Sequence, residues 1–235
     1  MNKKFLFLLF LIFIIIIIGL VFGTITIYRF SVLQDISRKI NDNLKKDNYH
    51  MKTTITSNDG TVSTTEAFYR EDVGKLIADN GIYTWADGKY AYMVDEEKKE
   101  VYILNINNEN IGLVSYDMFA TIVPGYKDTM RDKIFLAGNL RNKLKKSNVN
   151  DKDCFMIKTF NEKYSKTVWI DMAKAVPVKA ELEFENGIKM NYEYEIDFNE
   201  TRLKDIELPK IDEYTVINAE TNEIIQDSLK LNNNN

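Results

Sequence analysis

The sequence predicts a mostly β domain of the α+β class behind one N-terminal transmembrane helix. Two observations carry this prediction: an uncharged apolar run near the N-terminus, and a long succession of segments in which apolar and polar residues alternate. Apolar residues make up 45% of the chain and charged residues 28%, so it can bury a sizeable core. We divide it into an anchor (1–29), a membrane-proximal helix (30–47), a single sheet domain (48–218) and a flexible tail (219–235).

The anchor is an uncharged run from Phe5 to Phe22, and its apolar character persists to Ile27. As a helix it is long enough to cross about 30 Å of hydrocarbon, so we expect residues 5–27 to lie in the lipid bilayer. Lys3 and Lys4 precede the run. The positive-inside rule then places the N-terminus in the cytoplasm and the domain outside.

A cleaved signal sequence is the alternative to an anchor. Val21 and Gly23 are small enough for the −3 and −1 positions of a cleavage site. The apolar region of a secretory signal is usually shorter, about 7–15 residues, which favours an uncleaved anchor. No cysteine lies near this segment to be acylated, which excludes a lipid anchor.

The remainder of the chain is acidic. The net charge is −4 at pH 7, but Lys3, Lys4 and Arg29 flank the apolar run; without them 28 basic residues stand against 35 acidic ones, a net charge of −7. This composition argues against nucleic acid as a partner, because its binding needs a concentrated basic footprint. The densest basic run, Arg141 to Lys146, is typical of the solvated face or last turn of a helix.

Two stretches have helical spacing. Between Ser31 and Lys46 apolar residues recur every three or four positions, which predicts the first helix of the domain or a stalk. Between 107 and 149 the pattern is helical again, with one helix from Ile134 to Leu144 and a second within Leu113 to Ile122.

From Tyr49 onward the period is two, which predicts antiparallel strands separated by turns. A two-residue turn at Asp87-Gly88 places Trp85 opposite Tyr90, so that one face of this hairpin is aromatic. The later hairpin favours a three-residue loop with Gly187 in the left-handed conformation. That loop sets Phe184 opposite Ile188 and unites the apolar residues on one face.

Three stretches resemble the LolA-like family, which includes the LolA and LolB lipoprotein carriers, RseB-type regulators of envelope stress and anchored bacterial proteins of unknown role. They are Val168-Trp169-Ile170-Asp171 with Pro177-Val178-Lys179, then Ile206-Glu207-Leu208-Pro209, then Tyr214-Thr215-Val216-Ile217. The likeness covers about 49–217; Ala175-Val176-Pro177 stands where the family often has Gly-Leu-Pro. The resemblance implies a curved, half-open antiparallel sheet whose apolar concave face is covered by helices, at the bacterial cytoplasmic membrane.

In the carriers the concave cavity receives acyl chains. We therefore predict that an acyl chain or other apolar ligand binds here, with a lipid or lipoprotein as its source. The candidate residues on the concave face are Tyr83, Trp85, Tyr90, Tyr92, Val178, Ala180, Leu182, Phe184, Met190, Tyr192 and Tyr194. A simple packed core has the same composition, and the alternative is a regulatory or interaction module that contacts another envelope protein.

The chain offers little for catalysis, so we predict no enzyme, cofactor or metal site. His50 is the only histidine and no nucleophile motif accompanies it. Asp95-Glu96-Glu97 is followed by two lysines, which indicates a solvated hairpin tip rather than a calcium loop. Cys154 stands alone in an apolar run and is expected to be buried in a strand.

Overall fold

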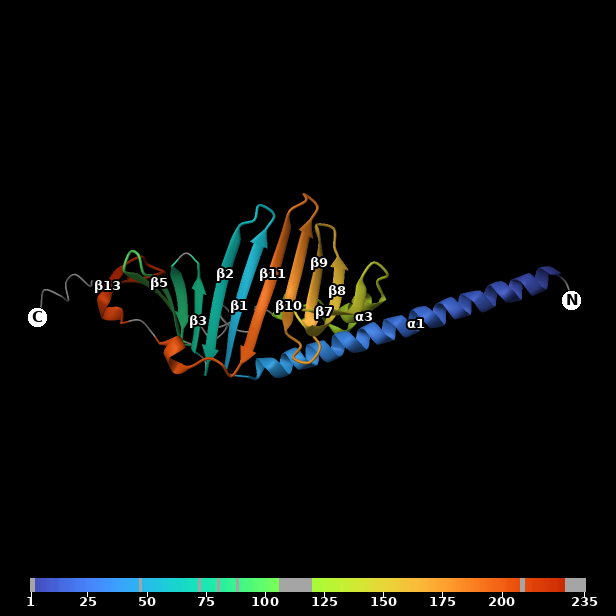
Figure 1. Cartoon of the computed structure of the whole chain (residues 1–235), viewed down its shortest axis with the longest axis horizontal. Coiled ribbons are helices and arrows are strands. Elements are labelled where there is room, and N and C mark those ends of the chain that lie inside the picture. The colour runs from blue at the N-terminus through green and yellow to red at the C-terminus, as the bar shows by residue number, and fades with distance from the viewer. Residues whose placement is uncertain are drawn as a thin grey trace, which may run out of the picture.

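The computed structural model describes residues 3–46, 48–71, 73–79, 81–87, 89–105, 120–207 and 210–226, with only the backbone at 3–6 and 8. Within these ranges the protein is mostly β, as predicted, with one large open sheet and a few helices (Figure 1). The predicted helix from Leu113 to Ile122 and the end of the tail fall largely outside the described residues, as do Asn80, Gly88 and Leu208-Pro209.

The helices are α1 (Lys3–Leu44), α3 (Met130–Gly138) and the short 3-10 helices η2 (Leu203–Ile206) and η3 (Ile211–Glu213). The strands are β1 (Asn48–Ser57), β2 (Val62–Arg70), β3 (Val73–Ala78), β4 (Ile82–Ala86), β5 (Tyr90–Asp95), β6 (Glu100–Asn105), β7 (Lys143–Val149), β8 (Lys152–Phe160), β9 (Tyr164–Asp171), β10 (Pro177–Phe184), β11 (Lys189–Phe198), β12 (Thr215–Asn218) and β13 (Ile224–Gln226).

These thirteen strands form one sheet in the order β13-β12-β6-β5-β4-β3-β2-β1-β11-β10-β9-β8-β7. The sheet is mixed rather than wholly antiparallel, because β12 runs parallel to β6. β13 lies within 219–235, where the sequence predicted a flexible tail, and it pairs with β12 through Ile217 and Ile224.

α1 continues without a break from the apolar run into the domain, so the predicted border at 29/30 falls inside one helix (Figure 1). By length and composition it is long and apolar enough to cross a membrane. Its last part buries Leu33, Ile36 and Ile40 in the main core. The stripe predicted between Ser31 and Lys46 therefore belongs to the first helix of the domain and not to a free stalk.

Polar contacts hold the end of α1 on the turn after β9. The ammonium of Lys39 donates to the carbonyl of Met172 at 2.8 Å, and the amide of Asn43 donates to the carbonyl of Lys174 at 2.7 Å. These bonds satisfy two carbonyls of the turn between β9 and β10. They fix the helix in place along the sheet.

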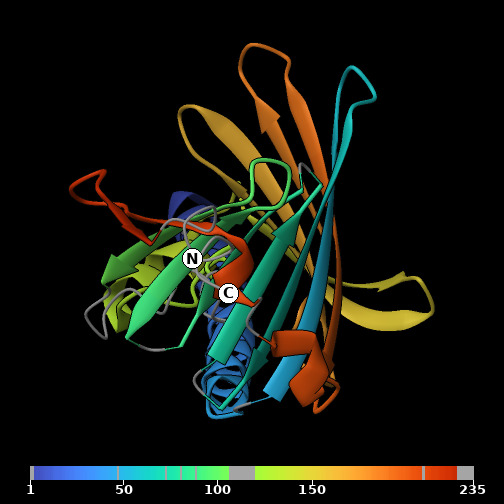
Figure 2. The same cartoon turned by 90° about the vertical axis from the view of Figure 1, so that its left-hand side faces the viewer.

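The two faces of the sheet have different partners. Met51, Ala67 and Tyr194 belong to the core that includes α1, and we call their face the inner face. Met51 on β1 pairs with Ala67 on β2. Thr53, two residues further along β1 and on the same face, pairs with Tyr194 on β11. Figure 2 looks along α1 and shows the sheet curving past one side of it. The opposite side of the sheet is the outer face.

The helix predicted from Ile134 to Leu144 is shorter than expected. α3 ends at Gly138, where the backbone N–H of Asn139 donates to the carbonyl of Phe135. The side chain of Asn139 then accepts from the N–H of Arg141, which turns the chain away from the helix. Leu144 instead pairs with Ile157 in the β7–β8 ladder. The basic run is thus a loop followed by the edge strand β7.

The hairpin of β10 and β11 has the predicted register. The N–H of Phe184 donates to the carbonyl of Ile188 at 2.9 Å, and Gly187 has φ of +81°. Glu183 pairs with Lys189 across the outer face, with 2.8 Å between the charged atoms.

Changing Gly187 to valine is expected to lower the free energy of unfolding by about 1 kcal/mol or more, because a β-branched residue is strained at positive φ. Nothing lies within 4 Å of an added Cβ, so a loss reports backbone strain rather than a clash. Urea titration of Gly187→Val and of the neighbouring control Asn186→Ala measures it. Equal, negligible effects at both positions contradict the three-residue loop.

The predicted register of the β4–β5 hairpin is wrong. Trp85 pairs with Tyr92, not with Tyr90, and Ala86 pairs with Ala91. The cause is the carboxylate of Asp87, which accepts the backbone N–H groups of Lys89 and Tyr90 and so moves the turn one residue along the chain. The partner of Trp85 is shifted by two residues along β5, so the same side chains still share a face. One face of this hairpin is therefore aromatic, as expected.

Candidate functional site

The inner face holds an open groove of about 290 Å³. Its walls come from β1, β2 and β11 and from the segment before α3. The lining residues are Thr53, Ile55, Thr65, Thr121, Ile122, Tyr192 and Tyr194. The volume is near the lower end of the range for small-molecule sites, about 300–1,000 Å³.

The strand ladders explain why a groove forms here. Thr53 lies between Tyr194 on β11 and Thr65 on β2, and Ile55 lies opposite Tyr192, so short and long side chains alternate across the same face. The rings of Tyr192 and Tyr194 are nearly parallel, 8° apart with centroids at 6.3 Å. The two tyrosines form one wall, and the threonines leave the space beside it.

The groove is apolar in its walls and neutral in charge. Burial raises the pKa of the Tyr194 hydroxyl, with the neighbouring Tyr192 adding to the shift, and burial alone raises the pKa of Tyr192. Both phenols therefore stay protonated at physiological pH. Within the described part of the chain, the buried hydroxyl of Thr53 has no hydrogen-bond partner, which leaves a polar atom at the groove.

A second, more polar groove of about 290 Å³ lies on the other side of Thr121, which lines both. It contains Lys166 and Asp128 beside the ring of Phe160. Burial lowers the pKa of the Lys166 ammonium, and the Asp128 carboxylate opposes that shift. A cationic group thus lies next to the apolar groove.

The structure brings some of the predicted residues to this face. Tyr192 and Tyr194 line the groove, and Ala180 lies fully buried beneath, opposite Tyr192. Leu182 and Met190 pair further along β10 and β11 and are half-buried. Phe184 at the end of β10 is half-buried and pairs with Tyr164 on β9. Val178 is buried next to a bulge between Pro177 and Lys179.

The aromatic set of Tyr83, Trp85, Tyr90 and Tyr92 lies elsewhere, and its predicted place on the concave face is wrong. Trp85 pairs with Lys75 on β3, and Lys75 pairs with Phe68 on β2, so these three side chains share one face of the sheet. Phe68 follows Ala67 directly in β2 and therefore points to the opposite face, the outer one. Trp85 and Tyr92 form a separate outer-face core with Tyr214, and the indole N–H of Trp85 donates to the carbonyl of Ile206 at 2.7 Å. An aromatic alternation alone does not say which face is covered by α1.

The residues weighed for catalysis have structural roles. The ring of His50 stacks on Phe68 on the outer face and contacts Glu66 at 2.8 Å. Glu96 sits in a hairpin tip, where hydrogen bonds from Lys99 and then Tyr214 lower its pKa. Cys154 is a buried free thiol in β8, and burial raises its pKa. The described residues contain no cluster of three metal-ligating side chains.

Sequence reasoning missed the other five groove residues, Thr53, Ile55, Thr65, Thr121 and Ile122. The alternation of Met51, Thr53 and Ile55 marked one strand face, but threonines in strands are common and carry no ligand signal. The signal needed was the pairing of β1 with β11, which joins residues far apart in the chain.

No family model and no curated protein matches this chain. Solved structures do. A chain in the structure of the Pseudomonas aeruginosa MucA/MucB complex is 16% identical to this chain with a TM-score of 0.46, and the match covers 75% of this chain and 62% of that chain. An uncharacterized conserved protein from Thermus thermophilus is 11% identical with a TM-score of 0.46, covering 79% of this chain and 98% of that one.

A LolA superfamily protein from Nitrosomonas europaea is 10% identical with a TM-score of 0.32, covering 74% of this chain and 97% of that one. The chain resembles LolA-like proteins in fold. It spans about three fifths of the MucB chains that it matches.

Proposed function

We propose that this protein is a membrane-anchored, extracytoplasmic and non-enzymatic module that binds an acyl chain in the inner-face groove. The observation that carries the proposal is the groove itself, with Ile55 and Tyr192 as apolar walls and about 290 Å³ of open space. Each methylene group that leaves water contributes about 0.8 kcal/mol. Affinity should therefore rise with chain length until the groove is full.

The polar groove beyond Thr121 supports a ligand with a charged end. The Lys166 ammonium is a partner for a carboxylate or phosphate, and its partial burial strengthens such a contact. A fatty acid or the acyl part of a lipid has this combination of apolar chain and anionic head. We place the chain along Tyr192 and Tyr194 and the head toward Lys166.

Filling the groove should remove binding. In a soluble fragment of residues 29–226, Thr65→Trp places an indole in the groove, because Thr65 lines it. We expect this change to abolish the fluorescence increase of a fatty-acid probe while the fragment stays folded by circular dichroism. Thr64→Trp is the matched control, because Thr64 is equally half-buried on β2 but lies on the outer face. Equal binding by both variants contradicts the site.

The membrane anchor is supported by the length and composition of α1 and by Lys3 and Lys4 before the apolar run. We expect the full chain to remain with the membrane after alkaline carbonate extraction. Protease added to intact protoplasts should digest the part after Arg29. Recovery of a soluble form that begins at Thr24 contradicts the anchor and indicates cleavage.

A second candidate function is recognition of another protein, and the free edge of the sheet favours it. β7 is an edge strand, and no strand among the described residues pairs with its free side. Such an edge can accept a strand from another protein. If the fatty-acid probe does not bind, recognition of an extracytoplasmic protein partner becomes the better account.

A further inference from the structure

We propose that the end of α3 rests in the headgroup layer of the outer leaflet, against anionic phospholipid. The surface consists of Phe135, Leu140 and Arg141, which we call the membrane-proximal tip. The inference rests on the proposed membrane anchor. It goes beyond that anchor because it assigns a lipid contact to the folded domain itself.

α3 lies alongside α1 and runs in the opposite direction. The amide of Gln34 donates to the sulfur of Met130 at 3.3 Å, near the start of α3. At the other end, a Cβ added to Gly138 would lie 3.8 Å from the Cγ2 atom of Thr26. The C-terminal end of α3 therefore points toward the apolar half of α1, and Figure 1 shows α3 at the end of the sheet from which α1 leaves the domain.

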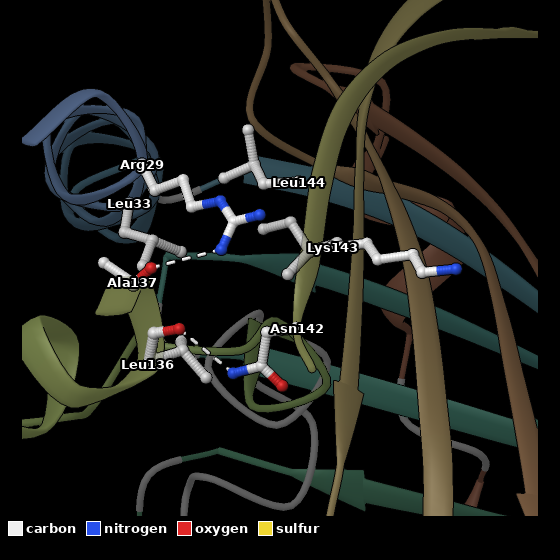
Figure 3. Close-up of a pocket in the computed structure, with 8 residues that line it drawn as sticks. Arg29, Leu33, Leu136, Ala137, Asn142, Lys143 and Leu144 are labelled. Carbon is white, nitrogen blue, oxygen red and sulfur yellow. Dashed lines mark hydrogen bonds between the residues drawn. The ribbon is translucent and has the colours of Figure 1, made fainter. Parts of the chain in front are cut away.

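Arg29 fixes this arrangement. Its guanidinium donates to the carbonyl of Ala137 at 3.3 Å (Figure 3) and to the carbonyl of Asn139 at 3.4 Å, at the C-terminal end of α3. A cation at this end adds a donor to the last carbonyls of the helix and complements the helix dipole. The cavity beside these groups is only about 10 Å³, so little space is left between α1 and the end of α3.

The position of the bilayer follows from the helix rise. A hydrocarbon layer of about 30 Å takes about 20 residues at 1.5 Å each. Counted from Phe5, the first residue after Lys4, the layer ends near Thr24. Thr26, which faces Gly138, is then a few ångströms outside the hydrocarbon. The membrane-proximal tip, on both sides of Gly138, then lies in the headgroup layer.

The exposure and charge of the tip suit this place. Leu140 is 76% exposed and Phe135 is 63% exposed, so both present large apolar side chains to the surroundings of the tip. The guanidinium of Arg131 lies over the ring of Phe135, 5.5 Å from its centroid. The segment 133–150 contains five basic residues and no acidic one, in a chain that is acidic overall. An apolar tip beside basic residues complements an anionic lipid surface.

Fluorescence quenching in the full-length chain tests the inference. The protein is inserted into nanodiscs of phosphatidylglycerol and phosphatidylcholine with bromine near the headgroup end of the acyl chains. Emission is taken relative to the unsubstituted chain, which subtracts Trp85 and Trp169. Leu140→Trp should lose most of its added emission. Leu203→Trp, also exposed at 64% but on η2 beside β2 and β3, should lose none.

Three further substitutions keep the outcomes separate. Ile16→Trp lies in the apolar run and reports insertion, with bromine placed deeper in the chain. Phe135→Trp repeats the tip measurement with a smaller change in shape. Arg141→Glu should weaken quenching of Phe135→Trp in anionic nanodiscs and leave it unchanged in purely zwitterionic ones.

Quenching of Ile16→Trp without quenching of Leu140→Trp or Phe135→Trp overturns the inference and frees the tip for a protein partner or a second copy. Absence of quenching at Ile16→Trp overturns the anchor itself and the inference with it. Quenching at the tip that does not respond to lipid charge or to Arg141→Glu overturns the anionic part of the proposal.

Discussion

Replacing Ile40 with alanine in the fragment of residues 29–226 is expected to lower the free energy of unfolding by about 2–5 kcal/mol. Ile40 is completely buried in the core between α1 and the inner face. Alanine leaves a cavity that the helix cannot fill, because Lys39 and Asn43 hold it on the turn after β9. Urea titration measures the loss.

The matched control is Ile188→Ala, which removes the same atoms from a side chain that is 47% exposed at the tip of the β10–β11 hairpin. We expect a change within about 0.5 kcal/mol there. A small effect at Ile40 as well means that the last part of α1 is a stalk and that the sheet folds without it.

Replacing Trp85 with alanine should cost about 3–5 kcal/mol, the usual range for a large buried aromatic residue. The ring packs edge-on against Tyr92 with centroids at 5.1 Å, and the indole N–H bonds the carbonyl of Ile206. The change removes the centre of the outer-face core and leaves that carbonyl unpaired. At a temperature where the variant remains folded, fatty-acid binding should be unchanged.

Trp169→Ala is the control for this prediction. Trp169 is half-buried on the outer face, where the Lys179 ammonium lies 5.2 Å from its ring centroid, so a smaller loss of stability is expected. If folded Trp85→Ala loses fatty-acid binding and little stability, the assignment of Trp85 to a structural core is contradicted. It would place the aromatic set at the ligand site, as the sequence alone had predicted.

Local features of this fold could be read from the sequence because each depends on few neighbours. The β10–β11 register follows from one glycine and from the alternation on both sides of it. The helix after Ser31 follows from the spacing of Leu33, Ile36 and Ile40. In both cases the deciding residues are within a few positions of one another, and burial of one face selects the register or the stripe.

The wrongly predicted elements depend on hydrogen bonds and strand pairings that the alternation of apolar and polar residues does not reveal. Asp87 moved its turn by binding two backbone N–H groups, and Asn139 ended α3 before Leu144. The assignment of Trp85 to a face needed the whole chain of pairs from β1 through β4. The groove likewise needed the pairing of β1 with β11, because Ile55 and Tyr192 are more than a hundred residues apart.

The most direct test of acyl-chain binding is photolabelling of the 29–226 fragment with a long-chain fatty acid that carries a diazirine on its chain. Peptide mass spectrometry then locates the adducts. The account predicts adducts on Ile55, Ile122, Tyr192 and Tyr194, lost in Thr65→Trp and retained in Thr64→Trp. Adducts spread over Leu140 and Phe135 with none at the groove, or labelling that Thr65→Trp leaves unchanged, would contradict it.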